Sequence, residues 1–573
     1  MKPRIFFPAL VLVVVTLLVV GLGGFWGLTA RNPLALINQG GQALPLGVQF
    51  VPKTSPITVS LLTRPDRLAD LWLFLSAPNS RRQTQAEIDR LEKTILANTD
   101  LNYEQDIRPW LGNEITFAVT ESDLDQDAEN GRQPGYLAIL SCQDSELAKT
   151  ALELFWQKRA IAGNSLVFEQ FAGSKLIYTQ TPTKSSGRAN LASAIVSNKF
   201  VLLANDPRVL QQALTSGQSK DLNLEQDLGY RKALSSLPDR RVGLVFLNLP
   251  ASLNWLGISS SNTPALALNE LGTADGVFDR AVLSLRLNRQ GLLADTALLA
   301  AAGHQFQPQM VGSEALTLAA SRLLPADSPL AIVGENLDQL WQDLRNNLPY
   351  YEPILQLGRP LWKSLEAALG SSPTPLLSWV KGEFALGLTN PSSQSQDWLL
   401  VTQHEADSQV AIDNLDALAR QQGLSVGPLV MGDYPVTAWT RLSVQPERGR
   451  SENRSELTVT TEVAGLHASL GGFDLFSTSP TALYRAFQVS ESSLDSEKQW
   501  RQAIAPFSRP NLGYLYLNWP ALEPELVREL PWLRLVETLG QPLFNHLQTV
   551  AITSYGRDQQ LQSGAFFLQL SNP

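Results

Sequence analysis

Residues 110–120 read Trp110-Leu-Gly-Asn-Glu114-Ile-Thr-Phe-Ala-Val-Thr120, and residues 379–389 read Trp379-Val-Lys-Gly-Glu383-Phe-Ala-Leu-Gly-Leu-Thr389. The two stretches align without a gap at a displacement of 269 positions. Each stretch places a glutamate four positions after a tryptophan and then continues as a mostly apolar run of strand length. A match of this length within one chain is typical of an internal repeat.

Further matches extend the repeat over the rest of the chain. Trp72 and Trp341 stand at the same displacement of 269, and Asn248 and Asn518 open two Asn-x-Pro segments displaced by 270. Because the displacement is nearly constant, we predict two tandem copies of one domain. The predicted parts are a first domain over residues 45–304, a linker over 305–314 and a second domain over 315–573.

Within each copy, short strands alternate with single helices. Residues 166–171 and 175–180 are typical of a hairpin, as are 192–197 and 200–205, and Asp206-Pro207 marks the start of a helix. Many hairpins with intervening helices indicate an α+β fold with largely antiparallel sheets and flanking helices. The alternative, a doubly wound parallel sheet, needs a regular strand–helix–strand spacing that the sequence lacks.

Composition and charge argue against several classes of protein and of site. The chain has 573 residues and a formal net charge of −9, and it contains no long basic run. Binding to nucleic acid needs a basic surface for the phosphates, so the sequence argues against that class. The single cysteine, Cys142, excludes an intrachain disulfide and a cysteine-ligated zinc site or cluster. No P-loop or dinucleotide fingerprint is present, so the sequence predicts no cofactor.

The amino-terminal segment predicts a membrane anchor. Residues 5–26 form an almost wholly apolar run, preceded by Lys2 and Arg4. A helix of that length spans about 33 Å, close to the thickness of the hydrocarbon core of a bilayer. By the positive-inside rule, residues 1–4 stay in the cytoplasm and the body after about residue 30 is exported. The alternative is a cleaved signal peptide, whose apolar region is usually shorter than this one.

Two segments resemble a bacterial family of unknown function. Asp106-Ile-Arg-Pro-Trp-Leu-Gly-Asn-Glu114 and Phe50-Val-Pro-Lys-Thr-Ser-Pro56, together with the order of hairpins and helices, are similar to the family called domain of unknown function 3352. The resemblance covers most of residues 45–573 and departs in the second copy, where Val380 and Lys381 replace the Leu-Gly pair. It implies a cyanobacterial-type, membrane-anchored exported protein, with its body in the periplasm or the thylakoid lumen. It brings no established activity and no catalytic residues.

The Trp110/Glu114 and Trp379/Glu383 pairs are the most distinctive candidate site residues. A glutamate facing a tryptophan in an apolar cleft can act as an acid with a raised pKa. The structural interpretation is that the tryptophan closes a corner and the glutamate opens the following strand. A catalytic residue needs to persist in only one copy, whereas a residue that determines the fold is needed in both. Persistence in both copies therefore favours the structural interpretation, for these pairs and for Asn248 and Asn518.

The loop at residues 121–129 carries five carboxylates in nine residues, and Asp123, Asp125 and Asp127 alternate along it. Such spacing suits a weak calcium site. However, Ala128 stands where a calcium loop turns on glycine, and the equivalent loop at 390–397 is neutral but for its last residue. The alternative, a solvated hairpin tip, is favoured.

Other groups that could carry chemistry are scattered along the sequence. The four histidines are distant from one another, and no HExxH zinc motif or GxSxG nucleophile elbow occurs. Cys142 precedes a predicted helix start, which can lower a thiol pKa, but we predict Gln403 at the equivalent position of the second copy. These observations favour a protein that is not an enzyme.

Three functions remain open, and the sequence ranks them. The first is a non-enzymatic scaffold or assembly protein that binds proteins of the membrane or envelope, because the chain combines an anchor, a duplicated body and no catalytic motif. The second is a carrier for an apolar ligand such as a lipid or pigment. The third is a cryptic hydrolase, which predicts a histidine or carboxylate cluster in one copy that the other copy lacks.

Overall fold

A computed structural model describes most of the chain after its amino-terminal segment. The predicted anchor, residues 1–4, Trp72 and Asp127 lie outside the described residues. None of the helices in the described ranges is long and apolar enough to cross a membrane. The described residues are 40–41, 44–67, 102–125, 132–179, 191–256, 278–309, 311, 318–346, 378–390, 397–447, 456–489, 492–529, 533–534, 537 and 544–571.

The first half of the described chain begins with the short helix η1 (Gly47–Phe50). Its strands are β1 (Ile57–Leu61), β2 (Leu111–Glu121), β3 (Gly135–Cys142), β4 (Leu166–Phe171), β5 (Ser174–Thr179), β6 (Ala192–Val196), β7 (Phe200–Ala204), β8 (Gly243–Asn248), β9 (Phe278–Asn288) and β10 (Gly291–Ala300). Its helices include α5 (Ser145–Ile161), α6 (Pro207–Gln218), α7 (Leu228–Ser236) and α8 (Leu249–Leu256).

The second half repeats this order from the short helix η5 (Ala320–Leu323) onward. Its strands are β11 (Leu330–Glu335), β12 (Glu383–Asn390), β13 (Asp397–Gln403), β14 (Ser425–Met431), β15 (Tyr434–Glu447), β16 (Glu456–Leu470), β17 (Phe473–Ser477), β18 (Gly513–Asn518), β19 (Leu547–Arg557) and β20 (Leu561–Leu570). Its helices include α9 (Leu337–Asn346), α13 (Ser408–Gln421), α14 (Pro480–Phe487), α15 (Lys498–Ile504) and α16 (Trp519–Glu529).

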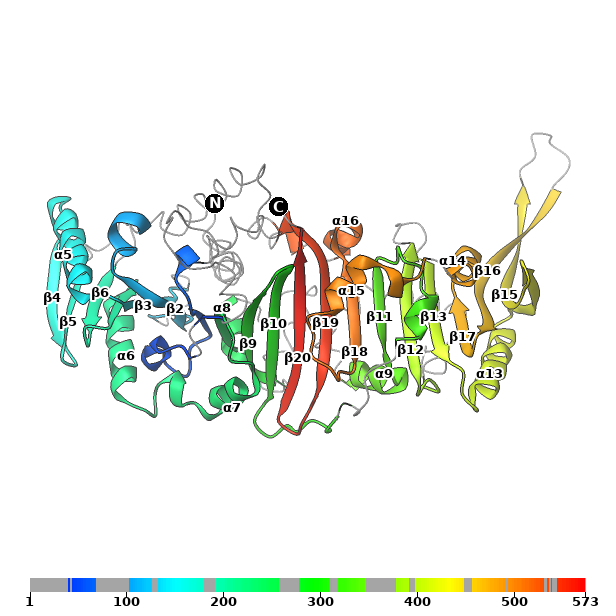
Figure 1. The fold of residues 1–573 in the computed structure, drawn as a ribbon, viewed down its shortest axis with the longest axis horizontal. Helices are drawn as coiled ribbons and strands as arrows, with labels where there is room; N and C mark the ends of the chain where they lie inside the picture. The colour runs from blue at the N-terminus through cyan, green and yellow to red at the C-terminus, as the bar shows by residue number, and fades with distance from the viewer. Residues whose placement is uncertain are drawn as a thin grey trace.

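The described strands form one continuous sheet in which all neighbours are antiparallel (Figure 1). The first half contributes the spatial order β4-β5-β6-β7-β3-β2-β1-β8-β9-β10. The second half continues it as β20-β19-β18-β11-β12-β13-β17-β16-β15-β14. The antiparallel sheet with its flanking helices confirms the predicted α+β class. That the sheet runs through both copies was not predicted from the sequence.

The two halves meet where β10 pairs with β20, in nine antiparallel residue pairs. Asp295 lies opposite Ala565, which is its own equivalent in the second copy at a displacement of 270. A pair that joins two equivalent positions marks a local two-fold axis, so the halves are related as the subunits of a symmetric dimer would be. In Figure 1, α6 accordingly lies low in the first half and its equivalent α14 lies high in the second.

A buried ion pair lies on this axis. The Asp295 side chain is 5% exposed and accepts two hydrogen bonds from Arg286 on β9, from Nε at 2.6 Å and from a terminal guanidinium nitrogen at 2.9 Å. By strand register, the second copy has Ala565 and Tyr555 at the equivalent positions, so these positions hold only one ion pair. A second pair would put two acidic side chains directly opposite each other, which is unfavourable.

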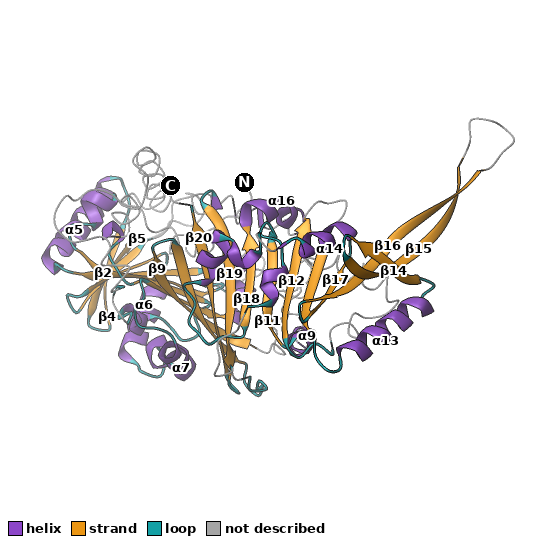
Figure 2. Ribbon diagram, turned by 45° about the vertical axis from the view of Figure 1, so that its right-hand side comes forward, coloured by secondary structure: helices purple, strands orange, loops and turns teal. Residues whose placement is uncertain are grey.

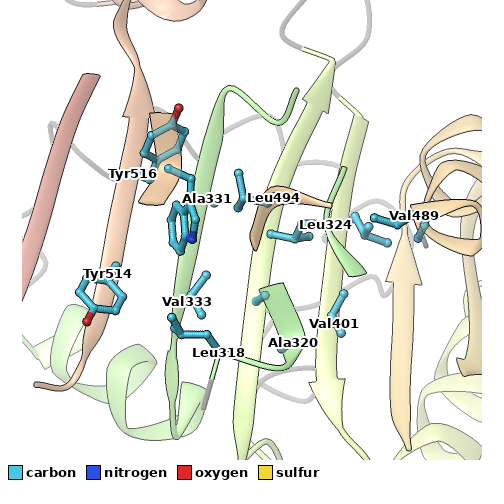
Figure 3. Close-up of a cluster of buried hydrophobic side chains, with 14 of the residues drawn as sticks. Leu318, Ala320, Leu324, Ala331, Val333, Val401, Val489, Leu494, Tyr514 and Tyr516 are labelled. Carbon is cyan, nitrogen blue, oxygen red and sulfur yellow. The ribbon is translucent and has the colours of Figure 1, made fainter. Parts of the chain in front are cut away.

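The two faces of the sheet carry separate cores, and helices flank the sheet along its length (Figure 2). On one face, η1, α6 and α7 cover the first half, while η5, α14 and α15 cover the second. Figure 3 shows part of the second of these cores, where side chains from η5 meet those of β11, β13 and β18. On the other face, α5 and α13 cover the outer strands and α8 and α16 cover the central ones.

Local signals explain where the equivalent helices α6 and α14 begin. Asp206 accepts a hydrogen bond from the backbone N–H of Arg208, and Pro207 occupies the first turn of α6, as the sequence predicted. Ser479 and Pro480 do the same for α14. Pro is tolerated there because its missing N–H would have no partner inside the helix.

Part of the predicted linker is tied to the second half. Phe306 is buried against Phe278, and its backbone N–H donates to Gln559. Gln309 and Arg557 exchange two backbone hydrogen bonds. The described part of the linker therefore packs beside the β19–β20 turn.

Removal of one partner of the ion pair at the axis should destabilise the fold more than removal of the other. Arg286→Met leaves the Asp295 carboxylate buried without its partner, so we expect a loss of about 3 kcal/mol in the free energy of unfolding. Asp295→Ala, which installs the residue of the second copy, leaves an arginine that is 25% exposed and can turn toward water. Its cost should be smaller, about 1 kcal/mol. Denaturant unfolding of the full chain measures both, and an equal or reversed order would contradict this account.

Candidate functional site

Glu114 and Glu383 each bind the start of a short helix. Glu114 on β2 is 1% exposed and accepts hydrogen bonds from the backbone N–H groups of Leu46 and Gly47, at 2.8 and 2.6 Å. Thr116 donates its hydroxyl to the same carboxylate at 2.9 Å. Glu383 on β12 likewise accepts from the N–H of Ala320, at 2.7 Å. These N–H groups begin η1 and η5, so each carboxylate satisfies donors that the short helix cannot satisfy itself.

The other repeat markers that the structure describes also contact the fold internally. The indole of Trp110 is 3% exposed and donates to the Asp106 carbonyl at 2.6 Å. Trp379 and Trp341 are half-buried beside the α13 core, and Trp379 packs edge-on against Phe476. None of these contacts places a glutamate carboxylate against an indole ring.

Asn248 and Asn518 end strands and start helices. Each side-chain oxygen accepts the backbone N–H of the residue three positions later, Ala251 or Ala521, at 3.3 Å. β8 and β18 therefore pass directly into α8 and α16, whose early prolines suit a first turn.

The described part of the acidic loop is held by protein groups. Asp123 accepts the backbone N–H of Gln133 across the loop, at 3.1 Å. The nearby Arg208 guanidinium donates to the Leu124 carbonyl, and its hydrogen bond to Asp206, with the charges of Asp125 and Glu121, raises its pKa. Within the described residues, no three or more His, Cys, Asp or Glu side chains are placed to hold a metal ion.

The sheet register corrects the predicted equivalent of Cys142. Ile115 pairs with Leu140 in the first half, and its equivalent Phe384 pairs with Thr402 in the second. The displacement between β3 and β13 is therefore 262, and Cys142 corresponds to His404 rather than Gln403. The predicted position was wrong by one residue because the loop between the paired strands is shorter in the second copy. Burial raises the pKa of the Cys142 thiol to about 11.

A polar cluster in the second half replaces apolar residues of the first. His404 Nδ1 lies 2.8 Å from the buried Asp474 carboxylate, which also accepts the Ser469 hydroxyl at 2.7 Å. The first-half equivalents of these three residues are Cys142, Val201 and Ile195. This cluster could not be predicted from the sequence, because His404 is far from Ser469 and Asp474 along the chain, although a histidine and a carboxylate in one copy alone are what the cryptic hydrolase predicts.

A second histidine–carboxylate pair shows how the copies diverge at a conserved contact. In the first half, Trp156 on α5 donates its indole N–H to Ser193 on β6, at 2.8 Å. Asp416 on α13 and His467 on β16 occupy the same positions and lie 3.0 Å apart. Trp439 also donates to the Asp416 carboxylate, at 2.7 Å. Each pair ties its outer helix to the sheet.

The carboxylates of Asp474 and Asp416 orient the rings of His404 and His467. Within the described residues, no hydroxyl or thiol forms a hydrogen bond with either ring, and the Ser469 hydroxyl donates to Asp474 instead. An activated serine or cysteine needs its base within hydrogen-bond reach. The cluster at His404 is a histidine–carboxylate pair whose imidazole is 43% exposed.

Exposed apolar side chains gather at the two ends of the sheet. At the β4 end these are Leu147, Leu154, Ile161 and Phe168, which belong to α5 and β4 and are 47, 51, 88 and 60% exposed. At the β14 end they are Val410, Leu429, Val430 and Tyr484, which are 63, 40, 74 and 42% exposed. Exposed apolar patches on a folded protein mark interaction sites, so the ends of the sheet are the candidate functional surfaces.

Removal of the Glu114 charge should destabilise the fold. Glu114→Gln replaces one acceptor oxygen by an NH2 group that faces backbone donors, so we expect a loss of about 2 kcal/mol in the free energy of unfolding. Glu146→Gln is the matched control, since that side chain is 79% exposed and only forms an ion pair with Lys149 on α5; its cost should be below about 0.5 kcal/mol. A Glu114 variant of unchanged stability would show that the carboxylate is not structural.

The raised pKa of Cys142 sets the pH dependence of its alkylation. Because only the thiolate reacts, a pKa of about 11 against the ordinary thiol value of 9.0 makes the folded thiol react about 100-fold more slowly than the unfolded one at pH 8. The folded-state rate should rise about tenfold per pH unit until the pKa is reached. Iodoacetamide labelling with and without denaturant measures this, and fast labelling of the folded chain would contradict it.

Known proteins resemble this chain at the level of family and, faintly, of structure. No curated protein matches it. A solved structure described as "Structure of crystal form I of TP0453" matches at 11% identity over 45% of this chain and 80% of that chain, with a TM-score of 0.24. The family described as "Protein of unknown function (DUF3352)" matches residues 10–570. The chain therefore belongs to this family, as its segments around Trp110 and Pro56 predicted.

Proposed function

We propose that the protein is a membrane-anchored, exported and non-enzymatic scaffold that binds a protein of the membrane or envelope at the β14 end of its sheet. The apolar run at residues 5–26 supports the anchor, and the same run would place the body in the periplasm or thylakoid lumen. The observation that carries the proposal is the uncharged, exposed surface of β14.

The β14 surface wraps around the edge of the sheet, with Leu429 and Tyr484 on the α14 face and Pro428 and Val430 on the α13 face. The three β14 residues are consecutive and exposed, and β14 contains no charged residue over its whole length. Tyr484 on α14 reaches the β14–β15 turn, where its ring lies 4.0 Å from the position of a Cβ on Gly432. Full burial of a valine or leucine side chain contributes about 1.5–3 kcal/mol, so this surface can anchor a protein partner.

The position of β14 suits a scaffold. The described chain enters the body at Gly41, whose backbone N–H donates to Arg241 just before β8. β14 lies twelve strands from β8 in the sheet. At about 4.8 Å per strand, the partner surface stands up to about 58 Å from the point of attachment.

Two variants test the proposal in intact membranes. Leu429→Asp combined with Val430→Asp introduces charge on exposed side chains, so the fold should persist while partner binding is lost. Leu228→Asp is the matched control, because Leu228 on α7 is 81% exposed and lies away from both ends of the sheet. Crosslinking, purification of the tagged full chain in mild detergent and mass spectrometry identify what is retained.

We expect one stoichiometric protein partner, reduced at least tenfold in the double variant and unchanged in the control. Equal retention by all three chains would contradict binding at β14. A chain that carries lipid or pigment but no protein would favour the carrier alternative. A bare monomer would direct attention to the cluster at His404 and to a hydrolase assay.

A further inference from the structure

The β4 edge of the sheet is open to another strand. β4 and β5 are joined by Ala172 and Gly173, both with positive φ (49° and 76°), and Phe171 pairs with Ser174 across this two-residue turn. Such a turn closes on a hydrogen-bonded pair, and hydrogen-bonded and non-hydrogen-bonded pairs then alternate along the hairpin. The backbone N–H and C=O groups of Gln170, Phe168 and Leu166 therefore point away from β5. Among the described strands, none pairs with this side of β4.

The opposite edge, β14, is closed to strand addition. Its hairpin turns at Gly432 and Asp433, and Met431 pairs with Tyr434. The same alternation directs the backbone of Val430, Pro428 and Val426 outward. Pro428, in the middle of this row, has no N–H to donate, which is how natural edge strands avoid pairing with other chains. β4 contains no proline, so the two ends of one sheet differ in what they can bind.

We propose that β4 pairs with β4 of a second copy of this chain, antiparallel and centred on Phe168. In this register Phe168 lies opposite Phe168 of the other copy, and Leu166 lies opposite Gln170. All three residues direct their backbone groups outward, so every facing pair can form its hydrogen bonds. A central aromatic pair between strands adds about 0.2–1 kcal/mol beyond the backbone hydrogen bonds.

The charges of β4 are compatible with this pairing. Glu169 is the only charged residue of β4, and in this register it lies opposite Val167 rather than another acid. Its carboxylate is directed into its own fold, where it accepts hydrogen bonds from Tyr178 and Gln211 at 3.1 and 2.9 Å. Pairing therefore places no like charges opposite each other, which would be unfavourable.

The molecule already contains an interface of the same kind. β10 and β20 are equivalent edge strands that pair antiparallel about a local two-fold axis, as β4 and its copy would. A two-fold interface uses the same surface on both partners, so pairing through β4 occupies that edge on both copies and closes at a dimer. A strand of another protein would not have to match β4 about a two-fold axis, as a second β4 does. A second copy of this chain is therefore the favoured occupant.

Helix α5 adds apolar surface on the face that the dimer would share. Phe168, Ile177 and Ser193 form one cross-strand row, and Ser193 accepts the Trp156 hydrogen bond from α5, so Phe168 lies on the α5 face. The exposed residues Leu147, Leu154 and Ile161 recur every seven positions along α5. A two-fold axis perpendicular to the sheet places both copies of α5 on this same face.

A cysteine at the axis tests the proposal directly. In the full chain carrying Cys142→Ser, Phe168→Cys would face its own copy at a Cα separation of about 5.5 Å, within the range that a disulfide spans. Mild oxidation in membranes should convert most of this variant into a covalent dimer. Val430→Cys on β14 is the matched control and should stay below about a tenth of that yield.

A Phe168→Cys chain that stays monomeric, that crosslinks to another protein, or that crosslinks no more than Val430→Cys would overturn the proposal. Phe168→Lys provides a second measurement without oxidation, since like charges at the axis should weaken dimerisation at least tenfold by sedimentation in detergent. Because these tests address β4 and partner capture addresses β14, the dimer and the scaffold function can fail independently.

Discussion

The pairing of β10 with β20 is the constraint on which the rest of the molecule depends. Each half places this strand at the edge of its own sheet, where a row of unpaired backbone groups would otherwise face water or another chain. Nine residue pairs join the two rows, and buried side chains cover the join on both faces: Leu293 and Phe567 on one, Leu292 and Ala294 on the other. As a result the two cores of each face continue across the axis, and the distance between the β4 and β14 ends is fixed.

The two halves keep their geometry while their chemistry diverges. Glu114 and Glu383 bind the same short helix start, which is why both copies retain a buried carboxylate there. Where the requirement is only a link between the outer helix and the sheet, a Trp–Ser hydrogen bond in one half is replaced by an Asp–His pair in the other. Glu114, Glu383 and the Asp416–His467 pair thus hold elements of the fold together.

Much of the fold could be predicted from the sequence, because its signals are local. The displacement of 269–270 residues predicted the repeated order of elements, and Asp206-Pro207 predicted the start of α6. The continuity of the sheet could not be predicted, since it depends on backbone hydrogen bonds that leave no pattern in the side chains of β10 and β20. The equivalence of Cys142 and His404 was missed because a loop of different length changes the displacement, and only strand register reveals it.

The same distinction between local and distant contacts explains the candidate surfaces. The sequence shows thirteen tryptophans and many other aromatic residues, but it cannot tell which of them are exposed. In the structure, Trp110, Trp156, Trp439 and Trp500 are buried, while the exposed residues of the β14 surface are mainly aliphatic. The two end strands differ in their outward backbone N–H groups. Pro428 removes one such donor from β14, whereas β4 contains no proline and keeps all of its donors. Strand addition at β4 and side-chain contacts at the β14 surface use different parts of the molecule, so self-association and partner binding need not compete for the same surface.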